Sequence, residues 1–429
     1  MPETIRPIRG MNDILPDQTP AWQHVEQQAR EILTGYGYQE IRLPVVERTE
    51  LFKRSIGETT DIVEKEMYTF DSRKGTSLSL RPEATAGMVR AGISNGLLHN
   101  QRHRLWCIGP MFRYEAPQKG RYRQFHQLDV EAFGYPGPDI DAELILLSAR
   151  LWKSLGLEGL RLKINSLGMP ESRGAYRQEL FEYFSAHEGA LDEDSRRRLE
   201  RNPLRILDSK NPEMQSIIRG APAITDSLDA ESDEHFGRLR EILDEAQVDY
   251  QVDSRLVRGL DYYTRTVFEW VTDRLGAQDA VCSGGRYDGL VAQLGGKPTP
   301  AIGWALGLER LVALHGTDDI PQPTPIAYMV LVGDRAALEG PALAERLRDK
   351  MPGLRLEVHC GGGGFKAQLK KADRSGASIA IILGDAEVER RSAAIKPLRE
   401  DAEQADYPWD ELPGIIERFG PGGGQVPTI

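Results

Sequence analysis

Apolar residues recur along the chain with two spacings, and the spacing changes from region to region. Short apolar runs of strand length occur at 41–46, 78–81, 105–108 and 267–271. The clearest helical spacing lies at 141–155, where leucine recurs every three or four residues and predicts a helix. Asp139 and Asp141 lie near its start, where carboxylates favour the cap and the helix dipole.

Two longer patterns predict how strands connect. The strand-like runs 105–114 and 124–133 flank a basic loop with Gly and Pro, which predicts a hairpin with a long tip. Strand alternation places Gln127, Asp129 and Glu131 on one side of the second run. The segment 299–310 predicts a strand that enters a helix.

The pattern changes again in the middle and near the end of the chain. The charged segment 171–251 reads as helical surface, and strand-like sequence resumes after it, so we predict an insertion. Beyond a Pro-rich linker at 321–325, apolar runs alternate with helical segments, which predicts a small α/β domain with a largely parallel sheet. The strands expected there are 326–332, 354–359 and 379–383, and the helices 336–350 and 365–373.

Composition limits the class of protein. A chain of 429 residues predicts two or three folding units, and 40% hydrophobic with 28% charged residues is ordinary for a soluble protein. No apolar run is long enough for a membrane span, and residues 1–16 lack the apolar core of a secretory signal. The three cysteines form no CxxC pair, so we expect neither disulfides nor structural zinc, as suits a reducing cytoplasm.

The net charge of the chain and its local charge give different indications about binding to nucleic acid. The net charge of −11 argues mildly against it, but nucleic acid meets only a local patch. Between Arg102 and Arg123 the chain holds six Lys or Arg residues and one acid, Glu115, with interleaved aromatics. This stretch fits a solvated face and a contact with RNA or a nucleotide about equally.

Several segments carry candidate chemistry, each with a structural alternative. Glu83 and Thr85 follow a strand stopped by Pro82, where a carboxylate suits an ammonium group, although the segment alone favours a helix start. Arg113, before the hairpin loop, fits a phosphate clamp or a structural ion pair. The segment 256–269 fits a site for a small polar ligand, or ordinary tyrosine packing.

Two further segments are rich in glycine. The turn 282–289 contains an arginine, but the chain has neither a GxxxxGK[ST] phosphate loop nor GxGxxG after a strand. In 299–310, Gly303 and Gly307 allow close packing, and Arg310 lies in the first turns of the predicted helix.

The order and spacing of these segments resemble histidyl-tRNA synthetases of the bacterial type over essentially the whole chain. Residues 38–47, with Pro44, resemble the first motif of class II synthetases, which forms the dimer interface. Residues 112–131 resemble the second motif and 303–310 the third. Residues 256–266 and 283–290 resemble the two signatures peculiar to the histidine enzymes, and these are the specific part.

The resemblance implies an α+β catalytic domain of class II fold, an antiparallel sheet flanked by helices, over 1–320 with the insertion at about 171–251. A C-terminal α/β anticodon-binding domain would occupy 326–420, and 421–429 would be a flexible tail. The implied protein is a cytoplasmic homodimer without a membrane partner. It would activate L-histidine with ATP and Mg²⁺ to histidyl-adenylate and transfer histidine to the 3′ end of tRNA(His).

The resemblance also implies roles for single residues. Arg113 and Arg258 would stabilise charge at the α-phosphate, and Arg121 and Arg310 would bind ATP. Histidine would be held by Glu83, Thr85, Gln127, Glu131, Tyr262 and Tyr263. No residue is assigned to a metal ion.

The chain departs from the family pattern at two positions. Ala84 replaces a common glycine, which is tolerable if its φ stays negative, and Ala116 replaces an arginine that some relatives carry in the hairpin loop. Two other classes compete with the synthetase: the synthetase-like regulatory subunit of ATP phosphoribosyltransferase, and sister synthetases for glycine, threonine or proline. The regulatory subunit characteristically lacks the C-terminal anticodon-binding domain and degrades the histidine signatures, and the sister synthetases carry other accessory domains.

Overall fold

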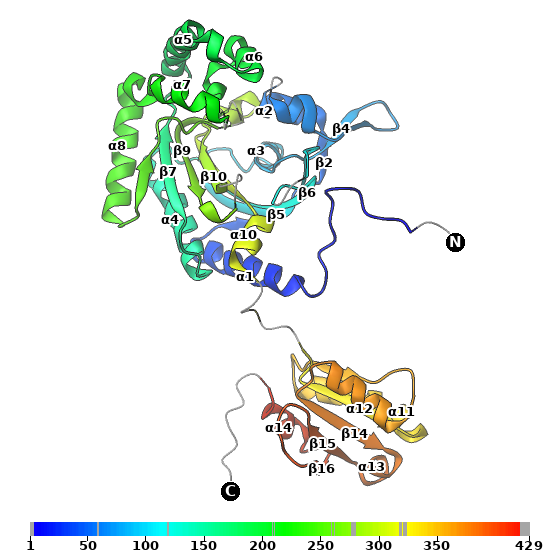
Figure 1. The fold of residues 1–429 in the computed structure, drawn as a ribbon. Helices are drawn as coiled ribbons and strands as arrows, with labels where there is room; N and C mark the ends of the chain where they lie inside the picture. The colour runs from blue at the N-terminus through cyan, green and yellow to red at the C-terminus, as the bar shows by residue number, and fades with distance from the viewer. Residues whose placement is uncertain are drawn as a thin grey trace. The chain divides into compact units, whose positions relative to one another are not determined.

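A computed structural model gives the fold of the chain as two compact units, residues 1–320 and 321–429 (Figure 1). The structure describes residues 4–57, 60–117, 120–207, 209, 211–258, 260, 262–275, 280–316, 320 and 324–420. The tail predicted at 421–429 lies outside these residues. None of the described helices is both long and apolar enough to cross a lipid bilayer.

An eight-stranded sheet organises the first unit. Its inner strands are antiparallel, and only the two edge pairs, β1 with β5 and β7 with β8, are parallel. The strands, in spatial order, are β1 (Gln39–Glu40), β5 (His103–Phe112), β6 (Gln124–Phe133), β11 (Ala301–Gly307), β10 (Ala280–Arg286), β9 (Thr264–Val271), β7 (Arg161–Ser166) and β8 (Tyr250–Val252). The predicted hairpin is confirmed as β5 and β6, although Arg113 lies one residue beyond β5.

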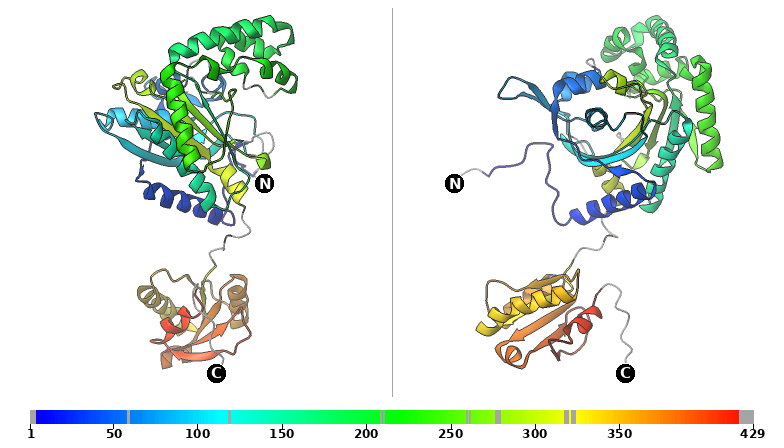
Figure 2. Two further views of the ribbon diagram at one scale, coloured as in Figure 1. Left: turned by 90° about the vertical axis from the view of Figure 1, so that its left-hand side faces the viewer. Right: turned by 180° about the vertical axis from the view of Figure 1, so that it is seen from behind.

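Four helices pack on one face of this sheet (Figure 2). They are α1 (Thr19–Gly35), α4 (Pro138–Ser154), α8 (Ala230–Glu245) and α10 (Leu308–His315). The helix predicted at 141–155 is confirmed as α4, and the predicted strand entering a helix is β11 followed by α10. Leu128 and Val130 of β6 join this apolar core, so the alternate residues of β6 point to the opposite face.

The opposite face carries a small sheet and short helices. Its strands are β2 (Val46–Arg48), β3 (Thr69–Asp71) and β4 (Ser77–Leu80), and its helices α2 (Thr49–Ile56), α3 (Thr85–Ser94) and α9 (Leu290–Gln293). The strand predicted at 41–46 is wrong, because β1 ends at Glu40 and β2 begins at Val46. Pro44 offers no N–H to a neighbouring strand, which explains the break.

The helical segment in the middle of the chain divides between two places. The helices α5 (Pro170–Ala186), α6 (Glu193–Arg201) and α7 (Gln215–Gly220) lie together beyond the sheet (Figure 1). In contrast, α8 packs on the large sheet through Phe236, Leu239 and Leu243, and β8 pairs with β7. The C-terminal part of the predicted insertion, from α8 onward, therefore belongs to the large sheet and to the helices that pack on it.

The described residues of the second unit, 324–420, form a five-stranded sheet in the order β13–β12–β14–β15–β16 and four helices. Its predicted elements are confirmed as β12 (Ala327–Val332), α11 (Asp334–Lys350), β13 (Leu356–Val358), α12 (Phe365–Arg374) and β14 (Ile379–Gly384), with β13, β12 and β14 parallel. The elements that follow were not predicted: α13 (Asp385–Arg390), α14 (Leu412–Glu417) and the antiparallel strands β15 (Ser392–Pro397) and β16 (Ala405–Pro408).

The three cysteines differ in their surroundings. Cys107 on β5 and Cys282 on β10 are buried in the large sheet, and burial raises the pKa of both thiols well above the usual value. Cys360, which follows β13 in the second unit, is exposed.

Candidate active site

One cavity of about 260 Å³ in the first unit is lined by every residue predicted to form the site. Its walls come from the turn between β4 and α3, the β5–β6 hairpin, the segment before β9, and the strands β10 and β11 with α10. The predicted residues found there are Glu83, Thr85, Arg113, Arg121, Gln127, Glu131, Arg258, Tyr262, Tyr263 and Arg310. Two residues of the candidate segment 256–269, Gly259 and Asp261, lie outside the described residues.

A carboxylate clamped by two hydroxyl groups forms one wall of the cavity. The Thr85 hydroxyl donates to Glu131 Oε1 at 2.6 Å, and the Tyr287 hydroxyl donates to Glu131 Oε2 at 2.5 Å. Gly303 faces Glu131 across the strand pair, where an added Cβ would lie 1.5 Å from Oε2. Burial, partly offset by these two hydrogen bonds, raises the pKa of Glu131 to about 8. Tyr287 was not predicted as a site residue.

Glu83 lies at the start of α3 and also lines the cavity. Its Oε1 accepts a hydrogen bond from the Ala86 amide at 3.0 Å, so it serves the start of α3. Its Oε2 is buried, has no hydrogen-bond partner among the described residues, and belongs to a side chain that lines the cavity. Ala84 has a φ of −103°, which confirms that alanine fits where the family pattern has glycine.

Two arginines face the cavity from different elements. Arg113 donates through Nε to the Pro82 carbonyl at 2.9 Å, and its guanidinium lies 5.3 Å from the centre of the Phe125 ring. Arg258 pairs with Glu269 of β9 at 3.1 Å, a partner that the sequence did not suggest. Because both guanidinium groups are held by protein contacts before any substrate binds, they form a preorganised positive environment.

The hairpin tip and α10 contribute the two remaining arginines. Arg121 forms an ion pair with Glu115, which also lines the cavity. Arg310 donates to the Gly120 carbonyl at 3.1 Å and to the Ala280 carbonyl at 2.7 Å. The first of these bonds joins the hairpin tip to α10.

Aromatic residues form another wall. The rings of Tyr262 and Tyr263 lie 4.7 Å apart, and Tyr262 meets Tyr287 edge-on at 5.5 Å. Gly285 makes room for them, because an added Cβ would lie 2.8 Å from the Tyr263 ring. Arg173 of α5 donates to the Tyr263 carbonyl, so the insertion contacts this segment directly.

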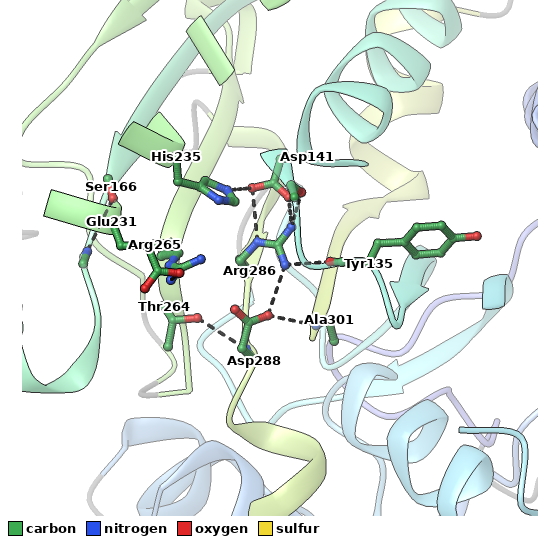
Figure 3. Close-up of polar contacts among 12 residues, drawn as sticks. Tyr135, Asp141, Ser166, Glu231, His235, Thr264, Arg265, Arg286, Asp288 and Ala301 are labelled. Atoms are coloured by element: carbon green, nitrogen blue, oxygen red, sulfur yellow. Dashed lines mark hydrogen bonds and ion pairs between the residues drawn. The ribbon is translucent and has the colours of Figure 1, made fainter. Parts of the chain in front are cut away.

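A buried ion cluster surrounds Arg286 (Figure 3), the residue directly before Tyr287. Arg286, fully buried, donates two hydrogen bonds to Asp141, one to Asp288 at 3.1 Å, and others to the backbone carbonyls of residues 135 and 137. His235 of α8 bonds Asp141 at 2.8 Å. We predicted that Asp141 serves the helix dipole; it lies in the first turn of α4, but its carboxylate is committed to Arg286 and His235.

A mainly antiparallel sheet backed by helices, with arginines and carboxylates around one cavity on its other face, defines a class II aminoacyl-tRNA synthetase fold. The comparisons with known proteins specify the family. The model described as "Histidyl-tRNA synthetase" matches residues 10–311, and an "Anticodon binding domain" model matches residues 327–419. The chain therefore belongs to the histidyl-tRNA synthetase family of aminoacyl-tRNA ligases.

Individual relatives agree with this assignment. The chain is 60% identical over 418 residues to the histidine–tRNA ligase of Halorhodospira halophila, covering 96% of this chain and 98% of that one. It is 57% identical over 423 residues to the enzyme of the same name from Alkalilimnicola ehrlichii, covering 98% of each chain. Among solved structures, the apo histidyl-tRNA synthetase of S. aureus matches with a TM-score of 0.80 and 35% identity, over 97% of this chain and 100% of that one.

Proposed function

We propose that the cavity of the first unit activates L-histidine with ATP to histidyl-adenylate, and that the same cavity then transfers histidine to the 3′ end of tRNA(His). The observation that carries this proposal is the convergence of Arg113 and Arg258 on a cavity that also holds Glu83, Gln127 and Glu131. Cationic groups suit the phosphates, whereas carboxylates and amides suit an amino acid with an ammonium and an imidazole.

In the first step the histidine carboxylate attacks the α-phosphorus, a P–O bond forms, and diphosphate leaves. Negative charge builds on the phosphoryl oxygens, and Arg113 and Arg258 stabilise it without having to reorganise. Arg310 and Arg121 bind the nucleotide from the α10 and hairpin side of the cavity. In the second step the terminal ribose hydroxyl attacks the carbonyl carbon of the mixed anhydride, and AMP leaves.

The proposed histidine subsite consists of carboxylate, hydroxyl and amide groups instead of arginines. Glu83 and Thr85 hold the amino end, and Gln127, Glu131, Tyr262 and Tyr263 line the amino-acid pocket. A buried polar pocket of this kind rejects apolar amino acids, because its groups would lose their hydrogen-bond partners.

Magnesium, in this proposal, enters with the phosphates of ATP. Within the described part of the chain no group of three or more His, Cys, Asp or Glu side chains is placed to hold a metal ion, so we assign it no protein ligand. When bound with ATP, magnesium would supply positive charge at the outer phosphates.

The tRNA would contact both units. The basic hairpin tip of the first unit offers charge for the acceptor end, and the match of residues 327–419 to an anticodon-binding model supports anticodon recognition by the second unit. We further propose a homodimer acting in the cytoplasm. The small sheet supports dimerisation, because it exposes Val46 by 39% and Phe70 by 45% of their surfaces.

Amino-acid-dependent pyrophosphate exchange with ATP tests the proposal. Exchange with histidine alone is expected. Exchange with another amino acid would identify a sister synthetase, and no exchange with any amino acid would identify a regulator; either result would overturn the proposed function.

A further inference from the structure

Asp129 is a fully buried carboxylate in the middle of the large sheet. It lies on β6, opposite Cys107 of β5 and Ala305 of β11, and 0% of its surface is exposed. It lines the cavity, yet neither Oδ1 nor Oδ2 has a hydrogen-bond partner among the described residues. Strand alternation places Asp129 beside Gln127 and Glu131, but no role was predicted for it.

The charged groups around Asp129 do not donate hydrogen bonds to its carboxylate. Burial, reinforced by the negative charges of Glu131 and Glu83, raises its pKa well above the usual value. Arg81 and Arg113 lower this pKa in part, but they donate hydrogen bonds to backbone carbonyls: Arg81 to those of residues 43 and 110, and Arg113 to that of residue 82. A buried carboxylate without a partner is costly, so a hydrogen-bond donor from outside the chain would stabilise the charged form of Asp129.

Two neighbouring acceptors are in the same condition. Glu83 Oε2 and Gln127 Oε1 are also buried without a hydrogen-bond partner among the described residues, and both side chains line the cavity. Glu131 differs, because Thr85 and Tyr287 already donate to both of its oxygens. The unsatisfied atoms of these three side chains are thus all acceptor oxygens, which suits a ligand group with several N–H donors.

An alkylammonium has this property, because it offers three N–H donors in a tetrahedral arrangement. Resting on the proposed function, we infer that Asp129 binds the α-ammonium of histidine together with Glu83 and Gln127. Asp129 is then a substrate-binding residue of the amino-acid subsite, and its partner arrives with the substrate. The Thr85 hydroxyl donates its hydrogen bond to Glu131, so an oxygen lone pair of Thr85 can accept a hydrogen bond from the same ammonium.

The test pairs a change in the protein with a change in the ligand. The variant Asp129→Asn keeps the shape of the side chain and removes its charge. The ligands are histidine and 3-(imidazol-4-yl)propionate, which lacks only the amino group. Calorimetry on the full chain should show histidine binding weakened about ten- to hundredfold, the value of a charge-assisted hydrogen bond. Binding of the analogue should change less than about twofold, as expected where no direct contact is lost.

Two controls keep the result interpretable. Asp253→Asn removes a carboxylate that pairs with Lys163 at 3.0 Å and does not line the cavity, so histidine binding should not change. Should Asp129→Asn not fold, the wild type gives a second measurement. Histidine binding at neutral pH should release more protons than analogue binding, seen by calorimetry in buffers of different ionisation enthalpy.

The outcomes separate the inference from the proposed function. Equal weakening of both ligands, unchanged histidine binding, a rise only in the KM for ATP, or equal proton release overturns the inference while leaving histidine activation intact. A wild-type chain that binds neither ligand overturns both.

Discussion

Arg286 of β10 bonds Asp141 of α4, the loop carbonyls of residues 135 and 137, and Asp288. Its replacement therefore tests whether the buried cluster holds the site in place. In Arg286→Met the guanidinium is lost and the bulk is largely kept. Asp141 retains only His235, and Asp288 keeps its bond from the Ala301 amide at 3.0 Å. Because Asp141 and Arg286 both have side chains that are 0% exposed, solvent cannot replace the lost bonds.

The expected cost follows from this geometry. Removing one partner of a buried ion pair leaves the other charge without compensation and costs about 3–5 kcal/mol. That is a large part of the roughly 5–15 kcal/mol by which domains are stable. As Tyr287 follows Arg286 directly and holds Glu131, the variant should also raise the KM for histidine more than the KM for ATP.

Urea unfolding followed by tryptophan fluorescence measures the loss, because Trp106, Trp152, Trp270 and Trp304 all lie in the core between the sheet and its helices. A matched control is Arg161→Met, whose ion pair with Asp273 is 57% and 79% exposed, so its removal should leave the unfolding curve almost unchanged. A loss below about 1 kcal/mol for Arg286→Met, or an equal loss in the control, would refute the reasoning.

Three other outcomes are expected. Arg258→Ala should slow histidine-dependent pyrophosphate exchange about 10²- to 10³-fold while changing the Kd of histidine only a few-fold, and a loss confined to histidine binding would contradict its role in charge stabilisation. Glu131→Gln tests the carboxyl whose pKa burial raises from 4.5 to about 8. The folded state holds this proton more tightly, so the wild type should lose stability relative to the variant as pH rises from 4.5 to 8, by on the order of 5 kcal/mol, and parallel urea-unfolding curves at each pH would contradict this. Arg310→Ala should raise the KM for ATP about tenfold or more with little change in the KM for histidine, measured by the same exchange reaction, and the reverse pattern would exclude a nucleotide contact.

Local patterns predicted the elements that depend mainly on local chemistry. The helix α4 has a regular leucine repeat, and the hairpin β5–β6 has two long runs around a polar loop, so both were recognisable. The strand β8 is three residues long and exists through its pairing with β7, and β15 and β16 complete a sheet begun far earlier in the chain. Short strands of this kind are fixed by tertiary context.

The site also combines features that could be predicted from the sequence with features that depend on tertiary contacts. Its ten predicted residues were grouped by their resemblance to a family, since each segment alone also fitted a structural role. Contacts over long sequence separations were not recognisable, including the bond between Tyr287 and Glu131 across 156 residues and the pair of Arg286 and Asp141 across 145. Asp129 was visible in the alternation of β6, but its burial without a partner appears only once β5 and β11 lie on either side of it.

The placement of the cysteines has a practical consequence for spectroscopy. Thiol reagents attack the thiolate, and Cys107 and Cys282 are buried with raised pKa values, so both resist labelling at neutral pH. The exposed Cys360 belongs to the other unit. A maleimide dye would therefore mark the wild-type chain at one position and report RNA docking on the second unit without engineered cysteines or any change to the chemistry of the first.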